Sequence, residues 1–241
     1  FITKPSLVKG ESAEEIRRLL PLKIKAAAGA RLGAYKNPVC FEEKKVKKTG
    51  PSGRLARKIV AIGASTGGPR ALEEVLKGFP ADLPAAVLIT QHMPAGFTDS
   101  LSKRLDRICP LKVAEAANGE SILESKAYVA PGGFHLLVAK DGTTLLSSSA
   151  PVNYVRPSAD LMMETAAEVF GPSVVGVVLT GMGRDGAEGM ARIKEKGGKT
   201  VVQDPNTAVI PSMPQAVIKK GSADMIVSLE RVAAVVTGLL K

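Results

Sequence analysis

Short apolar runs alternate with segments of helical spacing from Lys58 to the C-terminus. The Val, Ile and Leu runs lack the strict apolar and polar alternation of a sheet with one solvated face, so they are typical of strands covered on both faces. One pair of runs is joined by Lys140-Asp141-Gly142-Thr143, whose Asp-Gly pair favours a tight hairpin turn. The pattern predicts an α/β fold: a doubly wound, mostly parallel sheet with an inserted β-hairpin.

The expected elements follow these runs along the chain. Strands are expected at residues 59–62, 85–90, 111–114, 127–130, 135–139, 143–147, 174–179, 199–203 and 224–227. Helices are expected at residues 69–77, 96–107, 158–170, 187–195, 213–219 and 229–240. A further short helix is expected at residues 12–20, where Ser12 and Glu15 have the spacing of a capping box.

Charge divides the chain into two parts. The net charge is +10, but residues 1–58 hold 15 Lys and Arg against 5 Asp and Glu, whereas residues 59–241 hold 18 of each. A neutral main part argues against nucleic-acid binding, for which a basic domain would be expected. We therefore expect a basic linker over residues 1–57 and one domain over residues 58–241. The linker is either a solvated tether or a segment that docks onto an acidic partner.

The cysteines, the apolar runs and the histidines indicate which compartment and which cofactors to expect. Cys40 and Cys109 lie far apart and in no ligand-like spacing, which argues against a disulfide framework and favours a reducing cytoplasmic compartment. No apolar run approaches the roughly 20 residues of a membrane helix, so no membrane insertion is expected. Two histidines are too few for a His-rich metal cluster, and we expect neither a metal nor another cofactor.

Three expected strands end in segments rich in glycine and polar residues. Ser65 follows the first strand, His92 the second, and Asp185 the long buried strand at residues 174–179. In a parallel sheet these turns share one edge, where ligands of doubly wound folds bind. Serine, histidine and aspartate together form the set needed for acyl transfer: a nucleophile, a general base and a carboxylate that orients the base.

Each of these residues also has a structural interpretation. The Ser65 turn could cradle phosphate or cap a helix, although Pro69-Arg70 stands where a P-loop carries lysine and no G-x-G-x-x-G follows. His92 could be a hydrogen-bonding residue at a strand end. Asp185 could be the N-cap of the helix that follows it. Their shared placement favours the catalytic interpretation.

Two further residues are candidates for positioning substrate. His135 begins a strand of the expected hairpin, where it faces either water or the edge of the site. Arg156 precedes Pro157-Ser158, and its guanidinium could hold a substrate carboxylate or backbone. A structural role remains open for both.

Several sequence blocks resemble one family, the chemotaxis protein-glutamate methylesterases, also called the CheB family. The blocks are residues 62–68, 90–97, 130–135, 156–158 and 179–186, within a resemblance over residues 58–240. The resemblance implies a serine esterase that hydrolyses γ-glutamyl methyl esters on the cytoplasmic helices of methyl-accepting chemotaxis receptors and releases methanol. Deamidation of receptor glutamines is implied as a second activity. A glutamine deamidase and a non-catalytic receptor-binding module on the same fold are the alternatives.

The resemblance also assigns roles to residues. It implies that Ser65 is the nucleophile, His92 the general base and acid, and Asp185 the orienting carboxylate. Met182 matches a position whose backbone N–H helps to hold the oxyanion, and Thr66 lies beside the nucleophile. The chain departs from the family pattern at Val155, where related sequences often carry histidine.

The first five residues, Phe1-Ile2-Thr3-Lys4-Pro5, resemble the Lys-Pro turn near the end of a phosphoacceptor receiver domain. Methylesterases of this family carry such a domain at the N-terminus. We therefore expect residues 1–57 to contain the end of a receiver domain as well as the linker. That receiver is expected to be phosphorylated by a chemotaxis histidine kinase.

Overall fold

A computed structural model describes residue 21 and residues 53–241 of the chain. The described elements lie in a compact unit that spans residues 48–241. The strands are β1 (Ile59–Ala64), β2 (Ala86–Gln91), β3 (Lys112–Glu115), β4 (Lys126–Val129), β5 (His135–Val138), β6 (Thr144–Ser147), β7 (Val174–Val178), β8 (Lys199–Gln203) and β9 (Met225–Val227). The helices are α2 (Gly68–Lys77), α3 (Phe97–Ile108), α4 (Ala159–Phe170), α5 (Ala187–Glu195), α6 (Ser212–Lys219) and α7 (Leu229–Leu239), with a 3-10 turn, η1, at Gly171–Ser173.

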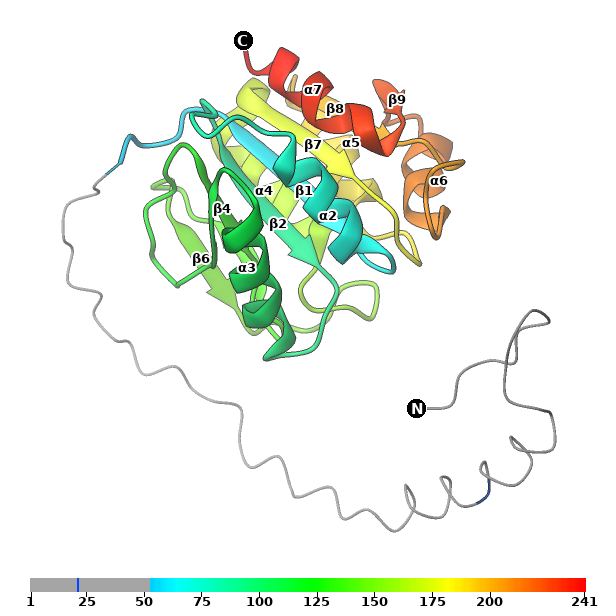
Figure 1. Ribbon diagram of the computed structural model, residues 1–241, viewed down its shortest axis with the longest axis horizontal. Helices are drawn as coiled ribbons and strands as arrows, with labels where there is room; N and C mark the ends of the chain where they lie inside the picture. The colour runs from blue at the N-terminus through cyan, green and yellow to red at the C-terminus, as the bar shows by residue number, and fades with distance from the viewer. Residues whose placement is uncertain (1–20, 22–52) are drawn as a thin grey trace. The chain divides into compact units, whose positions relative to one another are not determined.

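Seven strands form one sheet in the order β3-β4-β2-β1-β7-β8-β9 (Figure 1). Every neighbouring pair in this sheet is parallel. The chain builds outward from β1 first through β2 and later through β7, so the direction of winding reverses beside β1. In such sheets the crevice at the reversal point, outside the carboxyl ends of the strands, is where ligands bind.

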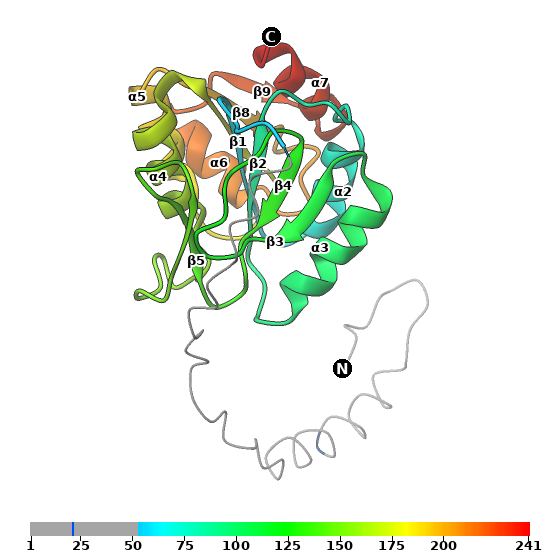
Figure 2. The same ribbon diagram turned by 90° about the vertical axis from the view of Figure 1, so that its left-hand side faces the viewer.

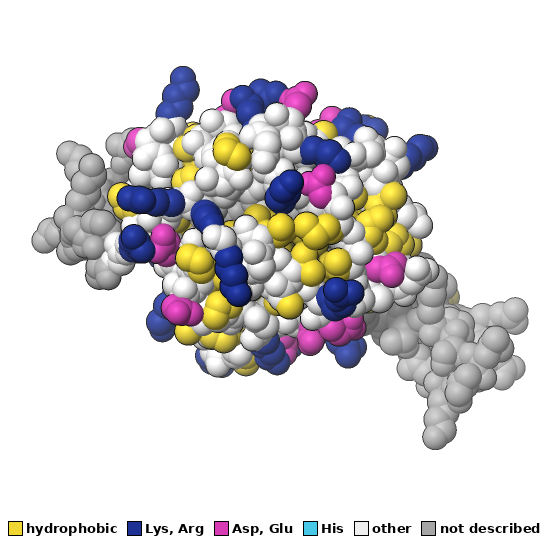
Figure 3. Space-filling model, turned by 90° about the horizontal axis from the view of Figure 1, so that it is seen from above, with side chains coloured by type: hydrophobic (Ala, Val, Ile, Leu, Met, Phe, Trp, Pro, Cys, Tyr) yellow, Lys and Arg dark blue, Asp and Glu magenta, His cyan; other side chains and the backbone are white. Residues whose placement is uncertain are grey.

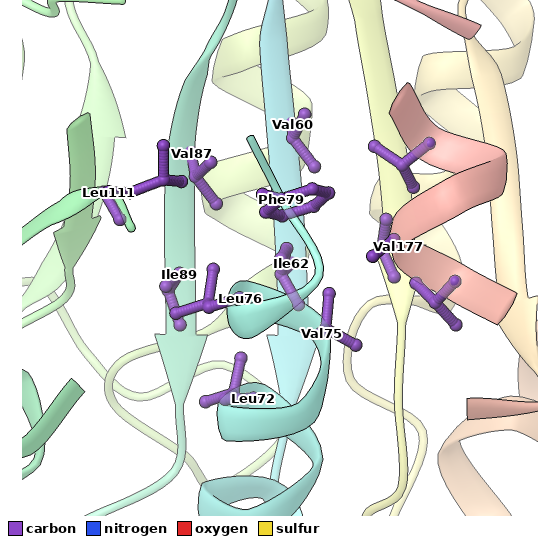
Figure 4. Close-up of a cluster of buried hydrophobic side chains, with 14 of the residues drawn as sticks. Val60, Ile62, Leu72, Val75, Leu76, Phe79, Val87, Ile89, Leu111 and Val177 are labelled. Carbon is purple, nitrogen blue, oxygen red and sulfur yellow. The ribbon is translucent and has the colours of Figure 1, made fainter. Parts of the chain in front are cut away.

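Helices cover both faces of the sheet, as the unalternating strands predict. Figure 2 shows α2, α3 and α7 on one side and α4, α5 and α6 on the other. One buried cluster lies under α2, and Figure 4 shows that it includes Leu72, Val75 and Leu76 of this helix together with Val60 and Ile62 of β1. A second cluster lies under α4, α5 and α6. The expected doubly wound α/β fold is confirmed.

The expected hairpin is confirmed, and it lies outside the main sheet. Strands β5 and β6 pair antiparallel as a separate two-stranded sheet. Its turn uses the Asp-Gly pair: Gly142 has a left-handed φ of 77°, and the Asp141 carboxylate accepts the Thr143 N–H at 3.1 Å. Leu136 and Val138 of β5 join the core beneath α4. The hairpin therefore extends the α4 layer and leaves the strand order of the parallel sheet unbroken.

A short segment before β1 pairs with the loop before β4. Leu55 forms an antiparallel bridge with Leu123, and the Ala56 N–H donates to the Ile122 carbonyl at 2.9 Å. These contacts begin before residue 58, where the charge pattern places the domain boundary. The helix expected at residues 12–20 lies outside the described residues.

The described surface mixes charges of both signs. The face seen in Figure 3 carries Lys and Arg side chains interspersed with Asp, Glu and apolar side chains. This distribution matches the equal numbers of acidic and basic residues after position 58. Among residue 21 and residues 53–241, no helix combines the length and apolar character that a membrane crossing requires.

Candidate active site

Strand register brings Ser65 and His92 together. In the parallel pair of β1 and β2, Ala64 lies opposite Gln91. The next residue of each strand, Ser65 or His92, therefore leaves the sheet beside the other. The His92 N–H donates to the Ala64 carbonyl at 3.1 Å, which continues the ladder one step beyond the strands. The two side chains thus reach the carboxyl edge of the sheet from adjacent strands.

Asp185 comes to the same edge from the loop between β7 and α5, and its carboxylate accepts four hydrogen bonds. His92 Nε2 lies 2.7 Å from Oδ2, and the Ala159 N–H donates to the same oxygen at 2.6 Å. Oδ1 accepts from Ser158 Oγ at 2.7 Å and from the Asp160 N–H at 3.1 Å. The carboxylate therefore binds the first N–H groups of α4 as well as the imidazole.

The electrostatics of this carboxylate favour its charged form. Asp185 is only 2% exposed, and burial by itself would raise its pKa. The hydrogen bonds from His92, the Ala159 N–H and Ser158 outweigh burial, so the pKa of Asp185 lies below its ordinary value. The partial positive charge at the N-terminus of α4 acts in the same direction. Asp185 is thus a buried anion beside the histidine.

This contact determines which nitrogen of His92 can act as a base. An ionised carboxylate only accepts hydrogen bonds, so Nε2 carries the proton that it donates to Asp185. In the neutral ring the other nitrogen, Nδ1, then has a free lone pair. Within residues 53–241, no hydrogen bond joins the Ser65 hydroxyl to a protein group. Nucleophile and base often approach closely only once substrate is bound.

The turn that carries Ser65 is packed against the turn after β7. The Ser65 N–H donates to the Thr180 carbonyl at 3.0 Å. Gly181 lies so close that a Cβ built on it would be 2.7 Å from Ser65 Cβ, far inside van der Waals contact. Glycine at position 181 is therefore needed to let the two turns meet.

Two backbone N–H groups near Ser65 are free to bind a substrate oxygen. Thr66 follows Ser65, and Met182 follows the glycine that touches it. Within the part of the chain that the structure describes, neither the Thr66 N–H nor the Met182 N–H donates a hydrogen bond to protein. Unpaired N–H groups close to a nucleophile are the usual components of an oxyanion hole, so these two groups are candidates for that role.

A family model described as CheB methylesterase matches residues 60–236, and this span contains all the residues of the site. The chain belongs to the CheB methylesterase family. A crystal structure of the CheB methylesterase catalytic domain of Thermotoga maritima is similar, with a TM-score of 0.73 and 40% sequence identity. The similarity covers 76% of this chain and 98% of that one. The expected family is thereby confirmed.

Two curated relatives are longer than this chain. The relative from Pyrococcus horikoshii, a protein-glutamate methylesterase/protein-glutamine glutaminase, is 46% identical over 96% of this chain and 64% of its own length. The relative from Bordetella bronchiseptica has the same name and is 42% identical over 95% of this chain and 65% of its own length. The chain thus spans slightly less than two thirds of these relatives.

Two residues expected to position substrate lie outside the cluster of Ser65, His92 and Asp185. His135 is fully buried, its Nδ1 accepts the Ser158 N–H at 3.1 Å, and Nε2 lies 3.2 Å from the Ala150 carbonyl oxygen. Burial, together with the charge of Arg156, lowers the pKa of His135 and favours its neutral form. His135 therefore supports Ser158, which in turn holds Asp185.

Arg156 donates its hydrogen bonds to backbone carbonyls of the same loop, between β6 and α4. Its Nη1 donates to the carbonyls of Ser148 and Ser149 at 2.7 and 2.8 Å. The Arg156 carbonyl accepts the Gly133 N–H at 3.4 Å. These bonds join the loops before α4 to the segment before β5. Nη1 of the guanidinium is thus bound to backbone carbonyls, whereas Nε is buried without a hydrogen-bond partner among the described residues.

Buried polar residues at or just after the ends of β2, β7 and β8 also support this site, although no sequence motif marked them. Gln91 Nε2 donates to the Ser65 carbonyl at 2.9 Å. Thr180 Oγ1 donates to the Thr66 carbonyl at 2.9 Å, and Gln203 Oε1 accepts the Thr180 N–H at 2.8 Å. Each is a polar residue at or just after the carboxyl end of an apolar strand. That placement was the available signal.

A second carboxylate lies behind Asp185. Asp160 is buried, its Oδ1 accepts the Gly189 N–H at 2.9 Å, and its Oδ2 accepts Asn153 Nδ2 at 3.1 Å. Burial raises the pKa of Asp160 to about 7, and the neighbouring charge of Asp185 adds to the rise. Asn153 Oδ1 also accepts Arg184 Nε at 3.1 Å. Asp160 therefore anchors an outer set of contacts around the Asp185 carboxylate.

Proposed function

We propose that this chain is a serine esterase that hydrolyses γ-glutamyl methyl esters on chemoreceptors and releases methanol. Two joined observations carry the proposal. His92 Nε2 lies 2.7 Å from Asp185 Oδ2, and the register of β1 and β2 places His92 beside Ser65. Relatives that are 41–46% identical to this chain over the aligned residues are named protein-glutamate methylesterase/protein-glutamine glutaminase. Deamidation of receptor glutamines is the second proposed activity, because attack on an amide needs the same three residues.

The reaction begins with attack of Ser65 Oγ on the ester carbonyl. Nδ1 of His92 takes the hydroxyl proton, and the buried charge of Asp185 stabilises the imidazolium through Nε2–H. When the tetrahedral intermediate collapses, the C–O bond to the methoxy group breaks and Nδ1 returns the proton to the leaving oxygen. Methanol departs, and the acyl group remains on Ser65.

Water completes the cycle by the same steps. His92 Nδ1 takes a proton from the attacking water, the acyl–oxygen bond to Ser65 breaks, and the proton passes to Ser65 Oγ. The product is a free glutamate carboxylate. In both halves the negative charge on the carbonyl oxygen is held by the free N–H groups of Thr66 and Met182. Such donors typically lower the barrier by about 3 kcal/mol each.

The proposed partners follow from this substrate. Methyl-accepting chemotaxis receptors present the ester on cytoplasmic helices, so we place the activity in the cytoplasm. A receiver domain phosphorylated by a chemotaxis histidine kinase is the proposed regulator, and it would act by covering the edge that holds Ser65 and His92. The resemblance of residues 1–5 to a receiver segment supports this second partner.

Methanol release from a methylated receptor fragment tests the function directly. The wild-type chain should release methanol, and the Ser65→Ala variant should lose activity by ~10³-fold or more at an unchanged Tm. Ammonia release from an unmethylated fragment, assayed with the same enzyme preparations, measures deamidation. Binding of the receptor without either product would instead identify a non-catalytic module, and ammonia without methanol would identify a deamidase.

A further inference from the structure

A two-residue turn lies against the loop that carries Asp185. Val152 and Val155 form an isolated antiparallel bridge, closed by N–H to carbonyl hydrogen bonds of 3.1 and 3.0 Å. The two residues between them, Asn153 and Tyr154, both have left-handed φ angles, 49° and 65°. Positive φ at both central positions is the geometry of a type I′ turn, which favours Asn-Gly. Here Tyr154 occupies the position that favours glycine.

Within the described residues, no packing of the Tyr154 side chain stabilises this backbone conformation. The side chain is fully exposed, with a relative accessibility of 101%, so the ring buries no area against the domain. A bulky residue with positive φ is an outlier among folded proteins. Strain of this kind persists where the surroundings impose it, and it concentrates at sites that bind ligands. An exposed aromatic ring on a strained turn therefore points to an external contact.

The turn is fixed to the catalytic loop through Asn153. Its Oδ1 accepts Arg184 Nε at 3.1 Å, and its Nδ2 donates to the buried Asp160 carboxylate at 3.1 Å. Arg184 directly precedes Asp185, which holds His92. Asn153 tolerates left-handed φ better than most residues, so the anchor itself is well suited to the turn. The turn that carries Tyr154 is thus bound to Asp160 and to the residue that precedes Asp185.

The loop beside Tyr154 presents two other exposed side chains. Met182 is 74% exposed, and the exposed Arg184 guanidinium supplies a positive charge. An aromatic ring, a thioether and a cation together fit a polypeptide that offers apolar side chains and carboxylates. Tyrosine, methionine and arginine are also the residue types enriched at protein interfaces.

We propose that Tyr154 is a specificity-determining residue whose ring contacts the polypeptide that carries the scissile ester. The proposal rests on the proposed function, because the polypeptide is the receptor helix that presents the γ-glutamyl methyl ester to Ser65. Tyr154 takes no part in bond making. It contributes binding that is equal in the ground state and the transition state, so its loss raises KM and leaves kcat unchanged.

The test compares Tyr154→Gly and Tyr154→Phe with the wild-type chain, with methanol release from a methylated receptor cytoplasmic fragment as the readout. Tyr154→Gly gives the turn its preferred Asn-Gly pair, so its Tm should equal or exceed that of the wild type. Its KM should rise by about tenfold or more at an unchanged kcat. Tyr154→Phe keeps the ring and should keep the wild-type KM. Ile226→Ala, at a half-exposed residue on β9, is the matched control and should change neither constant.

Each other outcome overturns the proposal. Wild-type constants for Tyr154→Gly would show that the ring makes no contact with the substrate. A fall in kcat at constant KM would show that the turn acts through the Asp185 loop instead. A wild-type enzyme that releases no methanol would overturn the proposed function, and this inference with it, whereas a defect confined to the Tyr154 variants bears on this inference alone.

Discussion

The carboxylate of Asp185 accepts the backbone N–H of Ala159 at 2.6 Å, although the two residues belong to different helix–loop segments 26 positions apart. Ala159 is the first residue of α4, so Asp185 caps a helix that precedes it in the chain. Its own following helix, α5, has Gly186 at the N-cap without a side-chain hydrogen bond. The N-cap role that the sequence offered for Asp185, at the helix that follows it, is therefore wrong: the side chain caps α4 instead, while it also contacts His92.

Replacing Asp185 should lower activity and stability together. Asp185→Asn removes the charge that stabilises the imidazolium, and we expect kcat to fall on the order of 10² to 10⁴. The amide also replaces an acceptor by a donor that faces N–H groups, so the free energy of unfolding should fall by about 1–3 kcal/mol. Methanol release and urea unfolding measure the two effects.

Ser158→Ala is the matched control for this substitution. It removes one hydrogen bond to Asp185 Oδ1 and leaves the His92 contact intact. Stability should fall by about 1 kcal/mol, with kcat reduced far less than in Asp185→Asn. An Asp185→Asn enzyme with wild-type kcat and lowered stability would leave only the capping role.

Gly181 gives a second test of how the site is assembled. Gly181→Ala places a Cβ 2.7 Å from Ser65 Cβ and also against the Met213 sulfur, so the Ser65 turn or the Gly181 turn must shift. Displacements of about 1 Å can cost ~10²-fold in rate, and overpacking costs about 1–3 kcal/mol of stability. Gly238→Ala in α7 makes the same change in open space and should be neutral or slightly stabilising. Equal activities in the two variants would contradict the packing argument.

The helices and strands could be predicted from the sequence because each has a recognisable pattern within its own residues. Unalternating apolar runs and helical spacing predicted the parallel sheet with helices on both faces, and the Asp-Gly pair predicted the hairpin. The strand-end glycines and polar residues also indicated where Ser65, His92 and Asp185 would meet, because parallel strands place their carboxyl ends at one edge.

Contacts between distant segments left no such signal. The loop between β8 and α6 packs on the Ser65 turn, where a Cβ on Gly67 would lie 2.8 Å from Val209 Cβ. The Ile210 carbonyl accepts the Gly181 N–H at 2.9 Å, which ties this loop to the second turn of the site as well. Nothing in the residues of that loop marks it as catalytic. The loop supports the site only through its tertiary contacts, which residue patterns within the loop do not predict.

The buried Asp160 should make stability depend on pH. Its pKa is raised from an ordinary value of 3.8 to about 7, so between these values the folded chain holds a proton that the unfolded chain releases. Stability from this group is therefore full below pH 3.8 and declines as pH rises toward 7. Asp160→Asn removes the titration, so the free energy of unfolding of the variant, relative to wild type, should rise between pH 4.5 and 7.5 by on the order of 1–4 kcal/mol.

Urea unfolding at several pH values measures this difference. The lowered pKa of His135 acts in the opposite direction, but it is common to both proteins and cancels in the comparison. The lowered pKa of Asp185 matters only below its ordinary value of 3.8, outside the window. Parallel stability curves for wild type and Asp160→Asn would show that Asp160 does not retain its proton in the folded chain.

Two deletions of the basic segment should differ in stability, because only the longer one removes the residues before β1 that contact the folded domain. Removing residues 1–52 takes away most of the basic excess and keeps the bridge of Leu55 with Leu123. Removing residues 1–57 also breaks the hydrogen bonds that join Arg54 and Ala56 to Glu124 and Ile122. At about 1 kcal/mol for each bond, the longer deletion should lose about 2 kcal/mol. For a domain of this size that corresponds to a fall in Tm of roughly 4–8 °C.

Activity should not follow this difference, because the bridge lies before β1 and Ser65 lies after it, at opposite ends of the same strand. We expect both deletions to release methanol from a methylated receptor fragment at the rate of the full chain at 25 °C. Calorimetry should then show the lowered Tm in the longer deletion only. A fall in Tm already present after removal of residues 1–52 would show that the basic segment contributes to the folded domain. Loss of activity in the longer deletion at 25 °C would show instead that the segment before β1 supports the position of Ser65.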